Sequence, residues 1–275
     1  MTSQTKHVLV TLLVLLASAG TALAGVPVAI LGSPGGGAAW NNDVQAKLLS
    51  TGFFSTVDIY AINTVTPTLA QLQNYVAVLV YSDSAAYADP VGLGNNLANY
   101  VDAGGGVVAA VFAVAGIPFS GRFATSDYWA LEPLGQNEGT PLTLGTIHVP
   151  GSPLLTGVTS FNGGTNSYYG TGSPNAAATR VVDWSNGAPL VVTRVIGGHN
   201  RVDLNFYPPS NSVRADFWVS STNGAQLMAN ALLYSAGLIG ATSVPALSTW
   251  AMVGLAILLA GLGALLVRST LASQG

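Results

Sequence analysis

The sequence predicts an α/β domain built on a doubly wound, mostly parallel β-sheet with an antiparallel edge, followed by one C-terminal transmembrane helix. Three observations support this fold class. Short apolar runs alternate with helix-like segments through the first half of the chain, which is the order of repeated strand, crossover and strand units. Turn residues separate consecutive strand-like segments in the second half. A long uncharged apolar run lies near the C-terminus.

Four segments of the first half are expected to be strands. Val76 to Tyr81 and Val107 to Ala113 are wholly apolar, as in parallel strands that are buried on both faces. Val26 to Leu31 is a shorter apolar run that ends at the glycine-rich loop Gly32 to Gly37, and Thr56 to Ile62 alternates in polarity.

Three helices are expected between these strands. The first is capped by Asn41 or Asn42 and runs to about Ser50. The second, Thr68 to Asn74, begins after a proline, and the third, Pro90 to Ala103, ends at three consecutive glycines.

The second half changes character. The chain from Ile117 to about Tyr169 is rich in Gly, Pro, Ser and Thr. The strands expected in this half are Leu142 to Val149, Arg180 to Trp184, Pro189 to Ile196 and Arg201 to Tyr207. The last two are joined across a Gly-Gly-His-Asn tetrad, which favours an antiparallel pair. Thr222 to Ala236 is expected to form the final helix.

The N-terminus has the three-part layout of a secretory signal peptide. Lys6 precedes an apolar stretch from Val8 to Ala17, and the small residues Ala22-Leu23-Ala24 follow it. Signal peptidase is therefore expected to cleave after Ala24 and to leave Gly25 as the mature N-terminus. The alternative is an uncleaved N-terminal anchor, which the short apolar stretch disfavours.

An apolar run near the other end is long enough to cross a bilayer. Ala251 to Val267 carries no charge, and with the residues before it approaches the roughly 20 residues that a transmembrane helix needs. Arg268 follows the run, and its charge favours the cytoplasmic side of the membrane. The sequence therefore predicts a membrane helix within residues 244–270.

The residues that lead into this run carry a more specific pattern. Pro245, Leu247, Ser248 and Trp250 precede a Gly/Ala/Leu-rich span and the basic residue Arg268. The pattern resembles the bacterial IPTL-CTERM sorting signal, one of the PEP-CTERM-like signals, and the resemblance implies cleavage by a membrane-embedded exosortase. The chain departs from the family in reading Val-Pro-Ala-Leu for Ile-Pro-Thr-Leu and in having a single arginine for a basic cluster. The alternative is a plain tail anchor that is never cut.

The composition fits a domain outside the cytoplasmic membrane and excludes several kinds of chemistry. The chain has 0 cysteines, so it offers no disulfide, thiolate nucleophile or Cys-ligated metal. Lys and Arg number 8 against 11 Asp and Glu, which argues against nucleic acid as a partner. Charged residues make up only 7% of the chain, so neutral groups supply most of its polarity. Such a surface is compatible with contacts to an envelope polysaccharide.

These patterns divide the chain into five parts. They are a signal peptide (1–24), one α/β ectodomain (25–238), a linker (239–243), the sorting signal with its helix (244–270) and a cytoplasmic tail (271–275). The ectodomain is long enough for one sizeable core. The expected location is the cell envelope, where the exported protein is anchored by the C-terminal helix or released after cleavage.

A second resemblance covers the predicted ectodomain. It is carried by the order of the strand Val76 to Tyr81, the helix end Leu97 to Gly106, the segment Ser152 to Val158 and the strand region Pro189 to Tyr207. This order resembles the class I glutamine amidotransferase-like fold, and especially its ThuA-like branch. The resemblance implies a flavodoxin-like, three-layer domain with a peripheral antiparallel edge.

The resemblance does not extend to the catalytic residue of the amidotransferases. Those enzymes carry a cysteine in the sharp turn after the strand that matches Val107 to Ala113, whereas this chain has Val114-Ala115-Gly116 there. The nearest hydroxyl, Ser120, does not lie in a Gly-x-Ser-x-Gly elbow. Neither His148 nor His199 then has a nucleophile to activate, so no catalytic residue is assigned.

The best candidates for ligand contact follow the third predicted strand. Asp83 lies at the end of a buried strand, where ligands of open α/β sheets gather, and Ser82 and Ser84 flank it. The alternative role for Asp83 is to cap a loop or helix. The loop Gly32 to Gly37 offers backbone amides but matches no phosphate-binding motif, and a tight turn explains it.

A second candidate combines a carboxylate with aromatic rings. Asp127 stands beside Tyr128 and Trp129 in an irregular segment, a composition used in sugar binding because rings stack on sugar faces. The alternative is that these residues fix a long loop to the domain. No spacing pairs His148 or His199 with a carboxylate as metal ligands, so neither a metal nor a cofactor is predicted.

The sequence favours a noncatalytic binding or structural module of the envelope. The alternative is a ThuA-like enzyme that acts on carbohydrate, with Asp83, Asp127 and His148 or His199 in an open cleft. Carboxylates brought together at the carboxyl edge of the sheet would favour the enzyme, and scattered carboxylates would favour the module.

Overall fold

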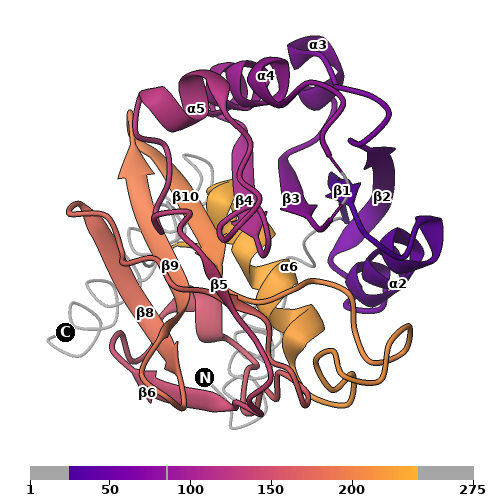
Figure 1. The fold of residues 1–275 in the computed structure, drawn as a ribbon. Coiled ribbons are helices and arrows are strands. Elements are labelled where there is room, and N and C mark those ends of the chain that lie inside the picture. The colour runs from indigo at the N-terminus through magenta and orange to yellow at the C-terminus, as the bar shows by residue number, and fades with distance from the viewer. Residues whose placement is uncertain (1–24, 85, 241–275) are drawn as a thin grey trace, which may run out of the picture. The chain divides into compact units, whose positions relative to one another are not determined.

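The computed structural model describes residues 25–84 and 86–240, and an eight-stranded β-sheet is its central feature (Figure 1). The strand order is β2-β1-β3-β4-β10-β9-β8-β6. In that order the strands are β2 (Phe54–Ala61), β1 (Val26–Ser33), β3 (Ala77–Ser82), β4 (Gly106–Ala110), β10 (His199–Leu204), β9 (Pro189–Ile196), β8 (Ala178–Trp184) and β6 (Leu144–Ile147).

The half of the sheet from β2 to β10 is parallel throughout. Every residue of β3 and β4 is buried, as the wholly apolar runs predict for strands covered on both faces. The strand order reverses between β1 and β3, which is the switch point of a flavodoxin-like sheet. The predicted α/β class with a mostly parallel sheet is therefore confirmed.

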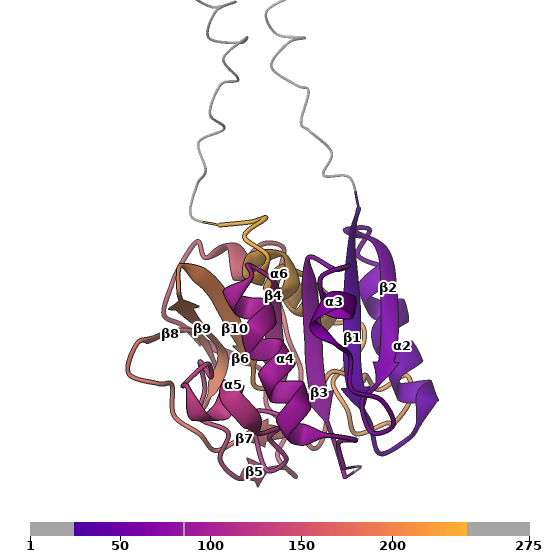
Figure 2. The ribbon, with the colours of Figure 1, turned by 90° about the horizontal axis from the view of Figure 1, so that it is seen from above.

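Helices cover both faces of this sheet, as Figure 2 shows. On one face, α2 (Ala38–Leu49) packs on β1 and β2, and α6 (Gly224–Ser235) packs on β3, β4 and β10. On the other face, α4 (Pro90–Asp102) packs on β4 and on the short helices α3 (Leu69–Leu72) and α5 (Gly121–Thr125). The described chain therefore has three layers.

Local sequence sets where these helices begin. Asp89 caps α4, because its Oδ1 accepts hydrogen bonds from the N–H groups of Val91 (3.1 Å) and Gly92 (2.8 Å). Thr68 caps α3 in a reciprocal capping box with Gln71. Both starts agree with the sequence prediction.

Helix α2 begins earlier than predicted. Its N-cap is Gly37, with a φ of 73°, and not Asn41 or Asn42. A Cβ atom at the preceding Gly36 would lie 1.9 Å from the indole of Trp40, so a side chain there would have to displace a ring that packs against Tyr207 and Phe217. The glycine loop is thus explained by the close approach of α2, as the tight-turn interpretation expects.

The antiparallel half of the sheet consists of β10, β9, β8 and β6. Gly197 and Gly198 join β9 to β10 with φ values of 58° and 87°, which suits the predicted hairpin. The predicted strand Leu142 to Val149 is present as β6. The Gly- and Pro-rich region around it also contains the 3₁₀ helix η1 (Pro153–Leu155) and a two-stranded sheet of β5 (Gln136–Asn137) and β7 (Tyr169–Gly170).

A fully buried ion pair lies in the central strand β10. The guanidinium of Arg201 donates to Oδ1 of Asp203 (2.8 Å), and the side chains of both residues are 0% exposed. The other carboxylate oxygen of Asp203 accepts hydrogen bonds from the backbone N–H groups of Ala130 and Leu131. This arrangement ties the segment after α5 to the sheet.

The predicted fold class is wrong in one respect. Within 25–84 and 86–240, no helix has both the length and the apolar character needed to cross a membrane, so the fold is corrected to the α/β unit alone. The segment 244–270, for which the sequence predicts the membrane helix and the sorting signal, lies outside the described residues, as do the signal peptide and the tail.

Candidate functional site

Three loops meet at the carboxyl ends of the parallel strands. Asp83 directly follows β3, Gly35 lies in the loop after β1, and Tyr207 lies in the loop after β10. The Tyr207 hydroxyl donates a hydrogen bond to Oδ2 of Asp83 (2.9 Å), and Gly35 lies so close that a Cβ atom on it would be 3.0 Å from the Asp83 carboxyl carbon. Asp83 is thus bound to a tyrosine that the sequence analysis did not single out.

The two serines beside Asp83 are also engaged. Ser82 is fully buried, and its Oγ donates to the carbonyl of Ile117 (2.9 Å), which accepts a second bond from the Tyr87 hydroxyl (2.7 Å). The backbone N–H of Ser84 donates to Oδ1 of Asp83 (2.5 Å). Both oxygens of the Asp83 carboxylate therefore have partners within the protein.

The tyrosines at this edge cannot act as bases near neutral pH. Burial raises the pKa of Tyr207 far above its ordinary value, and the negative charge of Asp83 raises it further. Burial likewise raises the pKa of Tyr81, with the charges of Asp43 and Asp83 as secondary causes. Both phenols are therefore protonated, and Tyr207 serves as a hydrogen-bond donor to Asp83.

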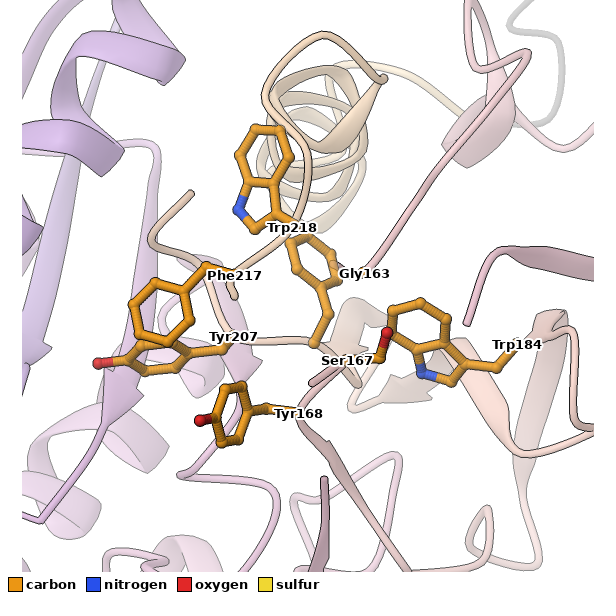
Figure 3. A pocket seen from close by; sticks show the side chains of 8 residues that line it. Gly163, Ser167, Tyr168, Trp184, Tyr207, Phe217 and Trp218 are labelled. Atoms are coloured by element: carbon orange, nitrogen blue, oxygen red, sulfur yellow. The ribbon is translucent and has the colours of Figure 1, made fainter. Parts of the chain in front are cut away.

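Aromatic rings fill the space behind this edge. The ring centroid of Tyr207 lies 5.0 Å from that of Phe217, 5.3 Å from that of Phe112 and 6.3 Å from that of Tyr168. Figure 3 shows the rings of Tyr207, Phe217 and Tyr168 gathered together, with Trp184 on the other side of the pocket. The cavity between these side chains has a volume of about 10 Å³. It holds about one water molecule and has no room for a sugar.

The turn after β4, where an amidotransferase would carry its cysteine, is apolar and packed. Phe112 is 5% exposed, and Val114 and Ala115 are fully buried. The Phe112 ring packs against Tyr168 and Tyr207. No hydroxyl or thiol therefore stands at that turn.

Asp127 lies at the opposite end of the strands from Asp83. Its Oδ2 accepts from Nη2 of Arg194 (2.6 Å), and Arg194 on β9 pairs with Arg201 near the start of β10. The hydrogen bond from Arg194 lowers the pKa of Asp127 below the ordinary value. The fold thus does not bring Asp83 and Asp127 together.

Trp129 is a core residue. It is 4% exposed, and its ring packs against Phe119 (4.7 Å) and Phe123 (4.9 Å). Its carbonyl accepts bonds from Arg194 (2.9 Å) and Asn175 (2.6 Å). These contacts fix the long loop to the domain, which is the alternative role weighed for this segment.

The two histidines lie apart from Asp83. His148 follows β6 at the antiparallel edge, where its Nε2 lies 2.7 Å from Oδ2 of the buried Asp183. His199 begins β10, at the amino end of the parallel strands. No spacing in the sequence pairs His148 with a carboxylate, because Asp183 becomes its neighbour only through the pairing of β6 with β8.

Acidic side chains are distributed over separate places in the described structure. Asp43 accepts from the N–H (2.7 Å) and hydroxyl (3.1 Å) of Ser210, and Asp216 pairs with Arg214 (2.8 Å). Residues 25–84 and 86–240 contain no group of three or more His, Cys, Asp or Glu side chains that could hold a metal ion. The candidate carboxylates Asp83 and Asp127 thus do not converge on one place in the described structure.

Comparisons with known proteins agree with the fold. No protein-family model matches the chain, and no curated protein matches it. A putative ThuA-like protein from Parabacteroides merdae is 15% identical with a TM-score of 0.58, and the match covers 81% of this chain and 94% of that one.

Two further solved structures are similar. A cytoplasmic protein from Salmonella typhimurium LT2 is 12% identical with a TM-score of 0.55, over 76% of this chain and 99% of that one. Another cytoplasmic protein from Salmonella typhimurium is 12% identical with a TM-score of 0.52, over 76% and 98%. At such identities the likeness concerns the fold alone. The chain therefore has a ThuA-like α/β fold.

Proposed function

We propose that the protein is an exported, noncatalytic binding or structural module of the cell envelope, carried on a ThuA-like domain. The observation that supports this proposal most directly is the state of Asp83 at the carboxyl edge of the sheet. Both oxygens of its carboxylate accept hydrogen bonds from the protein, and the cavity among the aromatic side chains behind it has a volume of about 10 Å³.

The proposed export rests on the sequence. The signal-peptide layout before Gly25 and the sorting pattern around Pro245 and Trp250 favour delivery through signal peptidase and an exosortase-like enzyme. The sparse charge of the chain suits contact with an envelope polysaccharide, and its acidic balance disfavours nucleic acid.

A carbohydrate-acting enzyme is the second candidate, and the ThuA-like fold is what favours it. Its three proposed groups would have to converge, yet Asp83 lies at the carboxyl end of the strands, Asp127 at the amino end and His148 at the antiparallel edge. The binding module therefore has the better support.

The test uses the full chain expressed in a bacterium with a cell envelope. N-terminal sequencing of protein from the envelope and the medium should begin at Gly25, and affinity electrophoresis should show retardation in gels that contain envelope polysaccharide. Protein that stays in the cytoplasm with Met1 in place, or that migrates unchanged in every gel, would refute the proposal.

A further inference from the structure

We propose that a cavity between β7 and the β8–β9 hairpin binds a uronic-acid unit of an acidic polysaccharide. This proposal rests on the proposed function as a polysaccharide-binding module and names its site and ligand class. The cavity has a volume of about 300 Å³. That volume is at the lower end of the roughly 300–1,000 Å³ found for small-molecule sites.

The cavity is separate from the carboxyl edge that holds Asp83. One wall is β7 with the residues that follow it, including Tyr169 and Thr171, and the other is formed by Arg180 of β8 and Pro189 of β9. Asn137 of β5 stands at the cavity as well. None of the aromatic side chains around the small cavity behind Tyr207 lines this second cavity.

The lining of the cavity favours a ligand with one negative charge and several hydroxyl groups. Arg180 is the only charged residue in the lining, and the polar groups beside it are neutral hydroxyls and an amide. No carboxylate stands in the lining to oppose an anion. A uronic acid carries a carboxylate for the guanidinium and ring hydroxyls for the neutral groups, whereas an inorganic anion would use the guanidinium alone.

Two contacts orient the guanidinium of Arg180. Its Nε donates to Oδ1 of Asp183 and its Nη2 donates to the carbonyl of Gly187. Within the described chain, these contacts leave the Nη1 donors of Arg180 without a protein partner. Asp183 is 5% exposed and does not line the cavity, so it holds the guanidinium from behind.

The two walls are held in place before any ligand arrives. Asn205 is fully buried, and its side chain accepts from the N–H of Gly170 (2.6 Å) and donates to the carbonyls of Gly170 (3.1 Å) and Pro189 (2.8 Å). Asn186 in the hairpin donates to the hydroxyl of Tyr169 (3.0 Å). A site whose walls are fixed by internal bonds loses little conformational entropy on binding.

The test measures binding of the full chain to polygalacturonate, with its fully methyl-esterified form as the neutral polymer of the same backbone. Two variants address the cavity. Asn137→Asp adds a negative charge at an exposed position in the lining that Arg180 shares, and Arg180→Gln removes the positive charge. The matched controls are Asn63→Asp after β2 and Arg214→Gln, whose side chain is 46% exposed against 36% for Arg180.

We expect polygalacturonate to bind wild type, and both cavity variants to bind it roughly 10- to 100-fold more weakly, because a hydrogen bond to a charged group is lost or opposed. The two control variants should bind like wild type, and the esterified polymer should bind weakly to all five proteins. Urea unfolding of each variant shows whether a loss of binding reflects a loss of folding. If Arg180→Gln unfolds the protein, the binding measured for Asn137→Asp alone decides whether the cavity is the site.

The outcomes separate this inference from the proposed function. Binding of polygalacturonate that is equal in wild type and Asn137→Asp would overturn the site and leave the binding module standing. If the esterified polymer bound as tightly as polygalacturonate, the uronic-acid class would be overturned. If sodium sulfate competed for the cavity as well as polygalacturonate does, the site would be a simple anion site. Failure of every polysaccharide to bind would overturn both proposals.

Discussion

The hydroxyl of Tyr207 donates a hydrogen bond to Oδ2 of Asp83 over 2.9 Å, although the two residues are 124 positions apart in the chain. This bond joins the loops that follow β3 and β10 at one end of the sheet, where Gly35 of the loop after β1 lies close to Asp83. The carboxylate that a ligand would meet at the switch point is thus engaged by the protein itself.

The first prediction concerns this bond. Tyr207→Phe keeps the ring contacts with Phe217 and Phe112 and removes only the hydroxyl, so we expect it to lower the free energy of unfolding by about 1–2 kcal/mol. Urea denaturation of the full chain measures the change. Tyr60→Phe is the matched control, because the Tyr60 hydroxyl contacts only the partly exposed Tyr75 hydroxyl (3.2 Å), and it should cost less. Equal costs for both variants would show that the hydrogen bond from Tyr207 to Asp83 stabilises the fold no more than a partly exposed one.

The buried ion pair of β10 gives a second prediction. Asp203→Asn leaves the guanidinium of Arg201 buried without its carboxylate, so we expect a loss of about 3–5 kcal/mol in unfolding free energy. Asp216→Asn, which breaks the more exposed pair with Arg214, should cost less than about 1 kcal/mol. Thermal and urea unfolding compare the two. A loss below about 1 kcal/mol for Asp203→Asn would show that the pair contributes little to the fold.

The exposed pair of Asp127 and Arg194 predicts a pH dependence. The folded pKa of Asp127 is lowered by the hydrogen bond from Arg194, so the pair stabilises the folded state above the unfolded pKa of the carboxyl. That stability is lost as the pH falls through the folded pKa. Asparagine also tolerates the positive φ of 59° found at position 127, so Asp127→Asn should change the ion pair without adding backbone strain.

We therefore expect the free energy of unfolding of wild type to exceed that of Asp127→Asn by no more than about 0.5 kcal/mol at neutral pH. The Asp127 side chain is 63% exposed, so solvent screens the pair. The difference should vanish at a pH below the folded pKa and should shrink at high salt. Unfolding free energies measured across this pH range are the check. A difference that is independent of pH would exclude the ion pair as its source.

Close packing of α4 against the loop before α5 gives a fourth prediction. A Cβ atom at Gly94 would lie 1.7 Å from the carbonyl oxygen of Ser120, so Gly94→Ala should destabilise the protein even though alanine is the better helix former. Gly116→Ala is the control, since its Cβ would meet only the flexible Gln136 side chain at 3.3 Å. We expect a loss of about 1–3 kcal/mol for Gly94→Ala, by urea unfolding, and a smaller effect for the control. A stabilising Gly94→Ala would show that this contact is loose.

The regular elements were largely predictable from the sequence because their patterns are strong. Pro189–Ile196 has the predicted bounds, and the buried strands β3 and β4 begin within one residue of the predicted positions. Their apolar runs admit few other structures. The elements that were missed, α5, β5 and β7, have five residues or fewer and lie in a Gly- and Pro-rich stretch where periodicity carries no signal.

The arrangement of the candidate residues was less predictable. The position of Asp83 after an apolar strand predicts that it lies at the carboxyl edge. Its contact with Tyr207 depends on the pairing of β10 with β4, which no local pattern reveals. Asn205 follows β10 as Asp83 follows β3, and that shared position was a signal that could have drawn attention to it. Asp127 lies at the opposite end of the strands because its loop is tied to β9 through Arg194.

One measurement tests the central claim most directly. The full chain and Asp83→Ala are incubated with envelope polysaccharides and with polygalacturonate, and bound protein and released reducing ends are measured in the same samples. We expect saturable binding by wild type, equal binding by Asp83→Ala and no release of reducing ends by either protein. Release of reducing ends by wild type that disappears in Asp83→Ala would contradict it and would identify the carboxyl edge as an active site.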